Sequence, residues 1–384
     1  MTGTSNAWAS ATLALRVFPG DPYLNLTLAR CERRAGKKSE ARARLEKTLG
    51  QAGDPSIRVQ ILFQLGWLYD DTGDFDRAFT TYSEAKQLSA EIAKAPAFDA
   101  DVPISLIKKA AALDLTRLPR VPFQGGGKGE ARNVAFLVGF PRSGTTLLNQ
   151  VLDAHPNLVA IEEKPILPHV STRLGEWRLR YPEDLSALSP VQVEELRADY
   201  FRLARDYVAF DEGSILIDKL PLNITHLPLI LTLFPDAKII LALRRPLACA
   251  LSCFMHNFRL NNAMVHMFSL ASITALYASV MGLWRGFVAK RPMAVQAVRY
   301  EDVVADLAGE GKKLCEFLGV PFSTAMLKYD QHARAKGLIN TPSYHQVVRP
   351  LYADSVDRWR HYEKFLAPYA PALEPFAKAF GYGG

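Results

Sequence analysis

The chain has 384 residues, of which 49% are hydrophobic and 22% charged, a composition typical of folded globular proteins rather than disordered chains. Its length suggests roughly two or three domains. The formal net charge of +7 favours anionic ligands, but no run of lysines and arginines is interleaved with aromatics, so nucleic acid is not the expected partner.

Cysteine usage and hydropathy bear on the compartment. The four cysteines form no CxxC pair, which is typical of reduced thiols in a cytoplasmic protein. No basic segment followed by an apolar stretch opens the sequence, so we expect no signal peptide. The uncharged stretch from Ala263 to Trp284 contains serines, a threonine and a glycine, so a buried helix is favoured over a transmembrane span.

Residues 1–116 show helical periodicity and an internal repeat. Five positions recur 37 residues later: Leu28, Ala29, Gly36, Ala41 and Leu45 correspond to Leu65, Gly66, Gly73, Ala78 and Tyr82. The pattern resembles the tetratricopeptide repeat of about 34 residues. Such an array is expected either to bind a peptide or protein on its concave surface or to serve as a structural or dimerisation platform, and both alternatives stay open.

A linker and a second domain are expected to follow. Residues 117–132 contain two prolines and then four glycines within five positions, which cannot sustain a helix or strand. From residue 133 to 384, helical stretches alternate with apolar strand-like runs at Val134–Val138, Ile215–Ile217, Ile239–Leu243 and Ala294–Val298. The alternation predicts a P-loop-like α/β fold, with a parallel sheet between helices and ligands bound at the carboxyl ends of the strands.

The segment from Val134 to Leu152 carries the strongest motif. A buried strand is followed by a loop between Gly139 and Gly144, and then by the N-terminus of a helix, an arrangement that binds anions through backbone N–H groups. The glycine spacing is that of the ATP-type P-loop, but Thr145 replaces its lysine. The loop therefore suits a group with less charge than a triphosphate, such as a sulfonate linked to a phosphate.

Further polar residues follow the next elements. An Asp-Ala-His-Pro step begins at Asp153, and two carboxylates, Glu162 and Glu163, come after a helix–loop–strand return that would bring them back toward the loop. From spacing alone, a solvated pair of carboxylates is the favoured interpretation. Lys219 follows the strand-like run ending at Ile217 and is placed to reach a bound anion, the alternative being a surface salt bridge with Asp218.

A second phosphate motif is expected after residue 239. A predicted strand ends at Arg244, and Ser252 follows eight residues later on a predicted helix that begins at Pro246. A guanidinium offers two parallel N–H donors to a phosphate, and the hydroxyl adds a third donor.

Together these motifs resemble those of sulfotransferases that use 3′-phosphoadenosine 5′-phosphosulfate (PAPS), and the segment from Pro141 to Glu163 resembles tyrosylprotein sulfotransferases. The resemblance implies that Glu163 is the general base and that Lys219 stabilises the leaving group. It also implies that Arg244 and Ser252 bind the 3′-phosphate. The departures are Arg245 and Ala248, at positions where an acidic residue or Asn is frequent. The 5′-phosphosulfate loop would comprise Arg142, Ser143, Gly144, Thr145 and Thr146.

The resemblance extends toward the carboxyl terminus. Tyr300 lies in a Tyr-Glu-Asp step and is a candidate nucleotide contact, with packing in the core as the alternative. Ser343 corresponds to a serine implicated in transition-state stabilisation in the resembled families. Arg349 and Arg358 are candidate phosphate contacts, and the sequence favours Arg358.

The sequence therefore predicts a cytoplasmic PAPS-dependent sulfotransferase with a helical repeat domain before it. The eight histidines show no metal-binding spacing, so no metal is expected. The alternatives are a P-loop nucleotide kinase with an atypical loop and a non-catalytic tetratricopeptide scaffold. The acceptor hydroxyl, on a peptide tyrosine, a carbohydrate or a small molecule, is left open, as are a homo-oligomeric state and the roles of Arg245 and Arg349.

Overall fold

The computed structural model describes residues 2–93, 98–127, 130–131, 133–336 and 354–383. The chain divides into two compact units. The first unit comprises residues 1–101, 250–274 and 359–369, and the second comprises residues 102–249, 275–358 and 370–384. Each is described below by itself.

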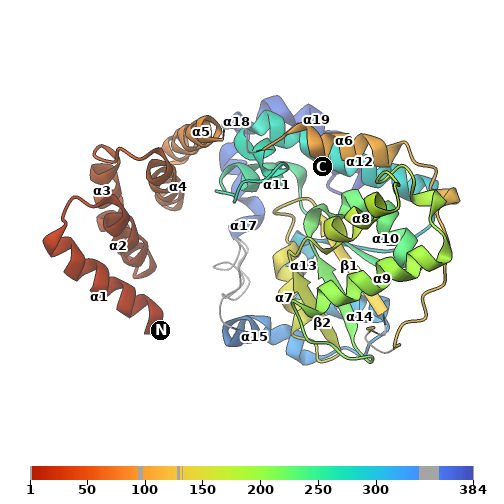
Figure 1. Ribbon diagram of the computed structural model, residues 1–384. Coiled ribbons are helices and arrows are strands. Elements are labelled where there is room, and N and C mark those ends of the chain that lie inside the picture. Colours follow the sequence, from red (N-terminus) through yellow and green to blue (C-terminus); the bar gives the residue numbers. More distant parts are fainter. Residues whose placement is uncertain (1, 94–97, 128–129, 132, 337–353, 384) are drawn as a thin grey trace. The chain divides into compact units, whose positions relative to one another are not determined.

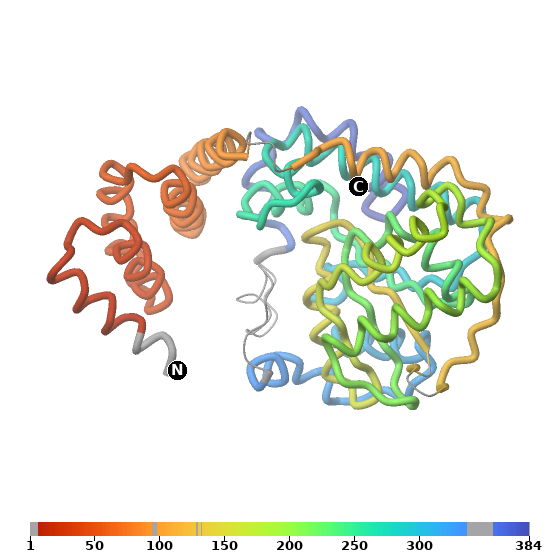
Figure 2. Tube along the Cα trace, in the orientation of Figure 1, coloured from red at the N-terminus to blue at the C-terminus, as the bar shows by residue number. Residues whose placement is uncertain are grey.

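Over its described residues, the first unit contains helices and no strand. Five helices follow one another along the chain: α1 (Thr2–Val17), α2 (Pro22–Arg34), α3 (Lys38–Leu49), α4 (Pro55–Asp71) and α5 (Phe75–Ile92) (Figures 1 and 2). Later segments add the end of α11 (Pro246–Phe254), η4 (Met264–Phe268), the start of α12 (Leu270–Lys290), the end of η6 (Arg358–Tyr362), α18 (Glu363–Leu366) and η7 (Ala367–Tyr369).

Small residues and local caps explain this helical packing. Gly66 faces the ring of Tyr82 so closely that a Cβ atom there would lie 2.8 Å from it, which brings α4 and α5 together. Asp54 caps the N-terminus of α4 by accepting a hydrogen bond from the N–H of Ser56 at 2.8 Å. Between α2 and α3, Arg44 forms a 2.7 Å ion pair with the buried Glu32.

The second unit contains the sheet and most of the remaining elements. Its strands are β1 (Asn133–Gly139), β2 (Leu158–Glu162), β3 (Ile215–Lys219), β4 (Lys238–Leu243) and β5 (Ala294–Arg299). Its longer helices include α6 (Asp101–Ala111), α7 (Thr145–Asp153), α8 (Ile166–Glu176), α9 (Pro190–Arg205), α14 (Leu307–Leu318) and α19 (Ala370–Ala379). Shorter elements are η1 (Leu115–Arg117), η2 (Leu185–Ala187), η3 (Pro221–His226), α10 (Leu227–Leu233), α13 (Tyr300–Ala305), η5 (Thr324–Lys328), α15 (Tyr329–Lys336) and α17 (Asp354–Asp357).

All described pairings in the sheet are parallel, in the order β2-β3-β1-β4-β5. The central strand β1 pairs Leu137 with Lys219 of β3 and Gly139 with Ala242 of β4. The next strand pair aligns Glu162 of β2 with Lys219. These registers bring the ends of β1, β2, β3 and β4 to one edge of the sheet. The predicted fold class, a parallel sheet between helices preceded by a helical region, is confirmed.

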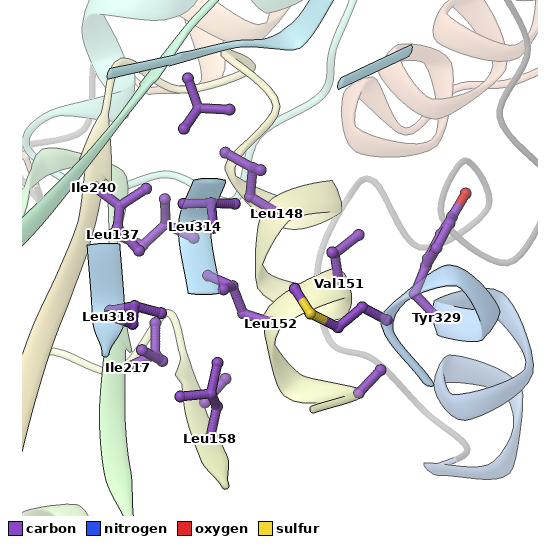
Figure 3. Packing of buried hydrophobic residues seen from close by; sticks show 14 of the residues in the cluster. Leu137, Leu148, Val151, Leu152, Leu158, Ile217, Ile240, Leu314, Leu318 and Tyr329 are labelled. Carbon is purple, nitrogen blue, oxygen red and sulfur yellow. The ribbon is translucent and has the colours of Figure 1, made fainter. Parts of the chain in front are cut away.

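Each face of the sheet has its own apolar core. One face packs Leu137, Ile217 and Ile240 against Leu148 and Leu152 of α7, with α14 and α15 completing the cluster (Figure 3). On the other face, Phe136 lies against Tyr200 of α9 and Phe234 at the end of α10. Because side chains alternate along a strand, Lys219 and Asp218 lie on opposite faces.

The long helix α12 contains most of the uncharged stretch that raised the question of a membrane span. Its inward residues, among them Ile273, Leu276 and Val280, are fully buried. None of the helices in the described ranges is both long and apolar enough to cross a bilayer.

Asp218 gives a testable pH dependence. It is fully buried, and its carboxylate accepts hydrogen bonds from Tyr200 at 3.1 Å and Asn223 at 3.2 Å. Burial raises its pKa to about 7 from an ordinary value of 3.8. Since the folded protein holds this proton more tightly than the unfolded chain, the stability from Asp218 is lost as pH rises toward and through about 7.

The unfolding free energy of the wild type should therefore fall by about 3 kcal/mol relative to that of Asp218→Asn when the pH is raised from about 5 to about 8. Urea denaturation at the two pH values measures the difference. Asp211→Asn is the control, because this exposed carboxylate has a pKa below its usual value and does not titrate in that window. Equal pH dependence of the Asp218 variant and the wild type would contradict the buried, protonatable carboxyl.

Candidate functional site

The loop between β1 and α7 has the conformation expected of an anion-binding turn. Gly144 and Arg142 both adopt the left-handed backbone region, with φ of 96° and 70°. A Cβ atom on Gly144 would lie 2.9 Å from the ring of Tyr300, so only glycine fits without displacement. The loop then leads directly into the first turn of α7, where Thr145 and Thr146 are buried.

One buried hydroxyl in this loop makes no hydrogen bond to the described residues. Ser143 is 3% exposed, and its Oγ has no hydrogen-bond partner among the residues that the structure describes. Burying a hydroxyl without a partner is unfavourable. The residue therefore fits a loop that is completed by a polar ligand.

Gly144 gives a prediction at this loop. Gly144→Ala should lower the unfolding free energy by about 1–3 kcal/mol, because alanine is strained at this φ and its Cβ meets Tyr300. It should also abolish measurable binding of the nucleotide proposed below. Gly175→Ala on α8 is the matched control, since its added Cβ meets no other part of the protein within 4 Å; it should leave nucleotide binding unchanged and should not lower the unfolding free energy, because alanine favours a helix over glycine. Thermal unfolding and calorimetric titration measure both.

A buried lysine and two carboxylates meet at the carboxyl edge of the sheet. The Nζ atom of Lys219 lies 2.8 Å from Oε1 of Glu163 and 3.2 Å from Oε1 of Glu162. The backbone N–H of Glu163 donates to the carbonyl of Lys219 at 2.7 Å, and Glu163 has a left-handed φ of 51°. The alternatives of a solvated carboxylate pair and of a surface pair between Lys219 and Asp218 are therefore wrong.

The lysine of this group is shielded from solvent, whereas the two carboxylates are partly exposed. The Lys219 side chain is fully buried, while 33% of the Glu163 side chain and 21% of the Glu162 side chain are exposed. A molecule arriving from solvent can thus meet the carboxylate of Glu163, whose orientation is fixed by the ammonium behind it.

The end of β4 adds a second cation beside the loop. The guanidinium of Arg244 lies 4.8 Å from the centre of the Tyr300 ring, and its Nη1 is 3.5 Å from the carbonyl oxygen of Arg142. The Tyr300 ring thus lies under the guanidinium of Arg244, and its Cδ2 atom lies close to Gly144. The structure brings these three predicted residues together.

Ser252, Arg358 and the Asp-Ala-His-Pro step are the other predicted features within the described residues. Ser252 is half-buried on α11, and Arg358 is half-buried at the start of η6. Ser343 and Arg349 lie outside the described residues. The Asp-Ala-His-Pro step is structural: Asp153 pairs with His332 at 2.9 Å, and His155 bonds the carbonyl of Pro321 at 2.8 Å.

One supporting residue was not identified from the sequence. The carboxylate of Glu301 accepts hydrogen bonds from the backbone N–H of Arg245 at 3.0 Å and from Tyr382 at 2.9 Å. Glu301 therefore holds the turn that follows Arg244. Its place in the Tyr-Glu-Asp step was the sequence feature that could have identified it. Its partner Tyr382 could not be inferred, because the two residues are 81 positions apart in the sequence.

Residues 135–324 match the model of the Sulfotransferase family. An uncharacterized protein of Aquifex aeolicus is 27% identical over 343 residues, which cover 86% of this chain and 43% of that protein. Protein-tyrosine sulfotransferase 1 of Danio rerio is 25% identical over 275 residues, covering 65% of this chain and 74% of the relative.

Among solved structures, the sulfotransferase domain of the Synechococcus PCC 7002 olefin synthase is similar, with a TM-score of 0.46 and 23% identity over 64% of this chain and 95% of that domain. The chain spans less than half the length of the Aquifex relative.

Proposed function

We propose that this chain, whose residues 135–324 match the model of the Sulfotransferase family, transfers the sulfonate of PAPS to an acceptor hydroxyl. The observation that carries the proposal is the contact of buried Lys219 with Glu163 at 2.8 Å, at the sheet edge where the anion-binding loop begins. A base and a cation side by side are what proton removal and leaving-group stabilisation require.

The loop suits the donor better than it suits ATP. In place of the lysine of an ATP-type loop, it offers backbone N–H groups, the side chain of Arg142 and the hydroxyls of Ser143, Thr145 and Thr146. The buried Ser143 hydroxyl and the side-chain-free Gly144 support close approach of a phosphosulfate. We assign Arg244 and Ser252 to the 3′-phosphate, Tyr300 to the nucleotide, and Arg358 to a further phosphate contact.

The proposed reaction is a direct in-line displacement. Glu163 accepts the proton of the acceptor hydroxyl while the acceptor oxygen forms a bond to sulfur. The bond between sulfur and the bridging phosphate oxygen breaks, and its electron pair stays on the phosphate. Lys219 and Arg142 stabilise the charge that develops there, and this interaction strengthens toward the transition state. Ser343 is proposed to contribute to the same stabilisation.

The acceptor is proposed as a hydroxyl of a peptide tyrosine, a carbohydrate or a small molecule. Protein-tyrosine sulfotransferases are among the relatives, which makes a tyrosine peptide the first acceptor to assay. We also propose that α2–α3 and α4–α5 are tetratricopeptide-type repeats, supported by the close packing of Gly66 on Tyr82. We also propose a cytoplasmic location, since the four cysteines form no CxxC pair and all are buried.

Calorimetric titration with 3′-phosphoadenosine 5′-phosphate (PAP) and with ATP tests the donor. We expect PAP to bind on the order of a hundredfold more tightly, since two donors to a 3′-phosphate are lost with ATP. Tighter binding of ATP would indicate a kinase. Absence of binding by both nucleotides would indicate a scaffold and overturn the proposed activity.

A further inference from the structure

Tyr382 follows α19 in the second unit and takes no part in the reaction proposed above. It is 7% exposed, and its hydroxyl donates to Oε2 of Glu301 at 2.9 Å. Burial and the neighbouring carboxylate raise the pKa of Tyr382 above its ordinary value, so the hydroxyl keeps its proton and can donate. A buried hydrogen bond to a carboxylate, across 81 positions of sequence, fixes two distant segments to one another.

Further contacts hold the turn that carries this tyrosine. The backbone N–H of Tyr382 donates to the carbonyl of Ala377 at 2.8 Å, and Gly381 adopts the left-handed region with φ of 78°. Arg299, the last residue of β5, donates through Nη1 to the carbonyl of Gly381 at 2.9 Å. The guanidinium groups of Arg299 and Arg245 each lie 5.6 Å from the centre of the Tyr382 ring. The main chain and two cations therefore set the position of the tyrosine hydroxyl.

The carboxylate of Glu301 gives one oxygen to each of its two partners. Oε2 accepts from Tyr382, while Oε1 accepts from the backbone N–H of Arg245 at 3.0 Å. Arg245 directly follows Arg244, whose guanidinium lies 4.8 Å from the centre of the Tyr300 ring. Loss of the tyrosine hydroxyl would release one side of the carboxylate, and the turn that follows Arg244 would be held less firmly.

We propose that Tyr382 is a positioning residue for the donor: through Glu301 it holds the turn after β4, so that Arg244 keeps the place in which it binds the 3′-phosphate. The inference rests on the proposed function and adds the turn after α19 to the residues that support donor binding. It also gives the side chain of Arg245 a role, which is to pack on the Tyr382 ring. Phenylalanine would fill the same space, so the specific contribution of the tyrosine is its directed hydrogen bond.

The first experiment compares two nucleotides in calorimetric titrations of the full chain. Tyr382→Phe should raise the Kd for PAP about three- to tenfold, part of the weight of one hydrogen bond to a charged group. Adenosine 5′-phosphate lacks the 3′-phosphate, so its Kd should stay within about twofold of the wild-type value. The KM for PAPS should rise with the Kd for PAP, while kcat at saturating donor stays unchanged.

A double-mutant cycle tests whether the tyrosine acts through Glu301. Glu301→Ala removes both contacts of the carboxylate, and in that background Tyr382→Phe should cost no further PAP affinity. Glu301→Gln should retain most of the affinity, because the amide can accept from the backbone N–H of Arg245 and donate to the tyrosine hydroxyl. If Tyr382→Phe does not fold, the two Glu301 variants carry the test, and equal PAP affinity of both would contradict the inference.

Tyr69→Phe is the matched control. It removes a hydrogen bond of 2.7 Å between a buried tyrosine and the carboxylate of Glu46, which joins α4 to α3 and involves no residue to which we assign a donor contact. The control should leave both nucleotide affinities and the KM for PAPS unchanged.

Four results would each overturn the inference: unchanged PAP affinity in Tyr382→Phe, an equal loss for both nucleotides, an undiminished loss in the Glu301→Ala background, or an equal loss in Tyr69→Phe. Failure of the proposed function is distinguishable, because the wild type itself would then bind PAP no more tightly than adenosine 5′-phosphate, and both proposals would fall.

Discussion

Glu163→Gln should lower kcat for sulfonate transfer by about 10²- to 10⁴-fold, the range typical of a lost general base. The amide keeps the shape of the side chain and one acceptor oxygen for Lys219, but it cannot take the acceptor proton. PAP affinity should stay within about twofold, because the proposed phosphate contacts lie on other residues. Steady-state turnover and calorimetric titration of PAP separate the two quantities.

Glu162→Gln is the matched control for this substitution. Glu162 also contacts Lys219, at the longer distance of 3.2 Å, and its side chain is less exposed than that of Glu163. We expect its substitution to reduce kcat by less than about tenfold, an effect of positioning rather than proton transfer. If the Glu162 variant lost more activity than the Glu163 variant, the assignment of the base would be reversed.

Lys219→Met should reduce kcat by about 10²- to 10³-fold, the usual loss when one electrostatic stabiliser of the transition state is removed. The KM for the donor should change little, because the ammonium gains most when charge develops on the departing phosphate. A rise in KM with unchanged kcat would instead assign Lys219 to ground-state binding.

The same substitution should also destabilise the fold. It leaves Glu162 and Glu163 without the buried cation that both of them contact. A fully buried pair costs about 3–5 kcal/mol to break, and the partial exposure of both carboxylates lowers this to about 1–3 kcal/mol. Lys164→Met removes a neighbouring lysine that lies 5.0 Å from the Tyr207 ring and should affect neither turnover nor stability by a comparable amount.

Glu301 and its neighbour Tyr300 lie between the two proposed phosphate motifs. Glu301 fixes the backbone of Arg245, while its neighbour Tyr300 touches both Arg244 and the glycine of the β1 loop. The contact with Glu301 uses the backbone N–H of residue 245 and does not depend on its side chain. The turn can therefore keep its conformation with arginine at a position where the resembled families often have Asp or Asn.

The sequence alone determined the features that depend on neighbouring residues. The strand, glycine loop and helix from Val134 to Leu152, and the alternation of strands and helices after residue 133, follow from local periodicity and turn chemistry. The absence of the P-loop lysine was likewise visible at Thr145. Such features persist because each requires only a few consecutive residues to favour one conformation.

Only the tertiary structure decided which distant side chains meet. Lys219 and Glu162 are 57 residues apart and become partners because β2 and β3 pair in one register, which spacing alone cannot specify. In the same way, Lys86 reaches the carbonyl of His256 across 170 residues. Burial of apolar faces selects these arrangements, and the polar contacts at their ends follow from that packing.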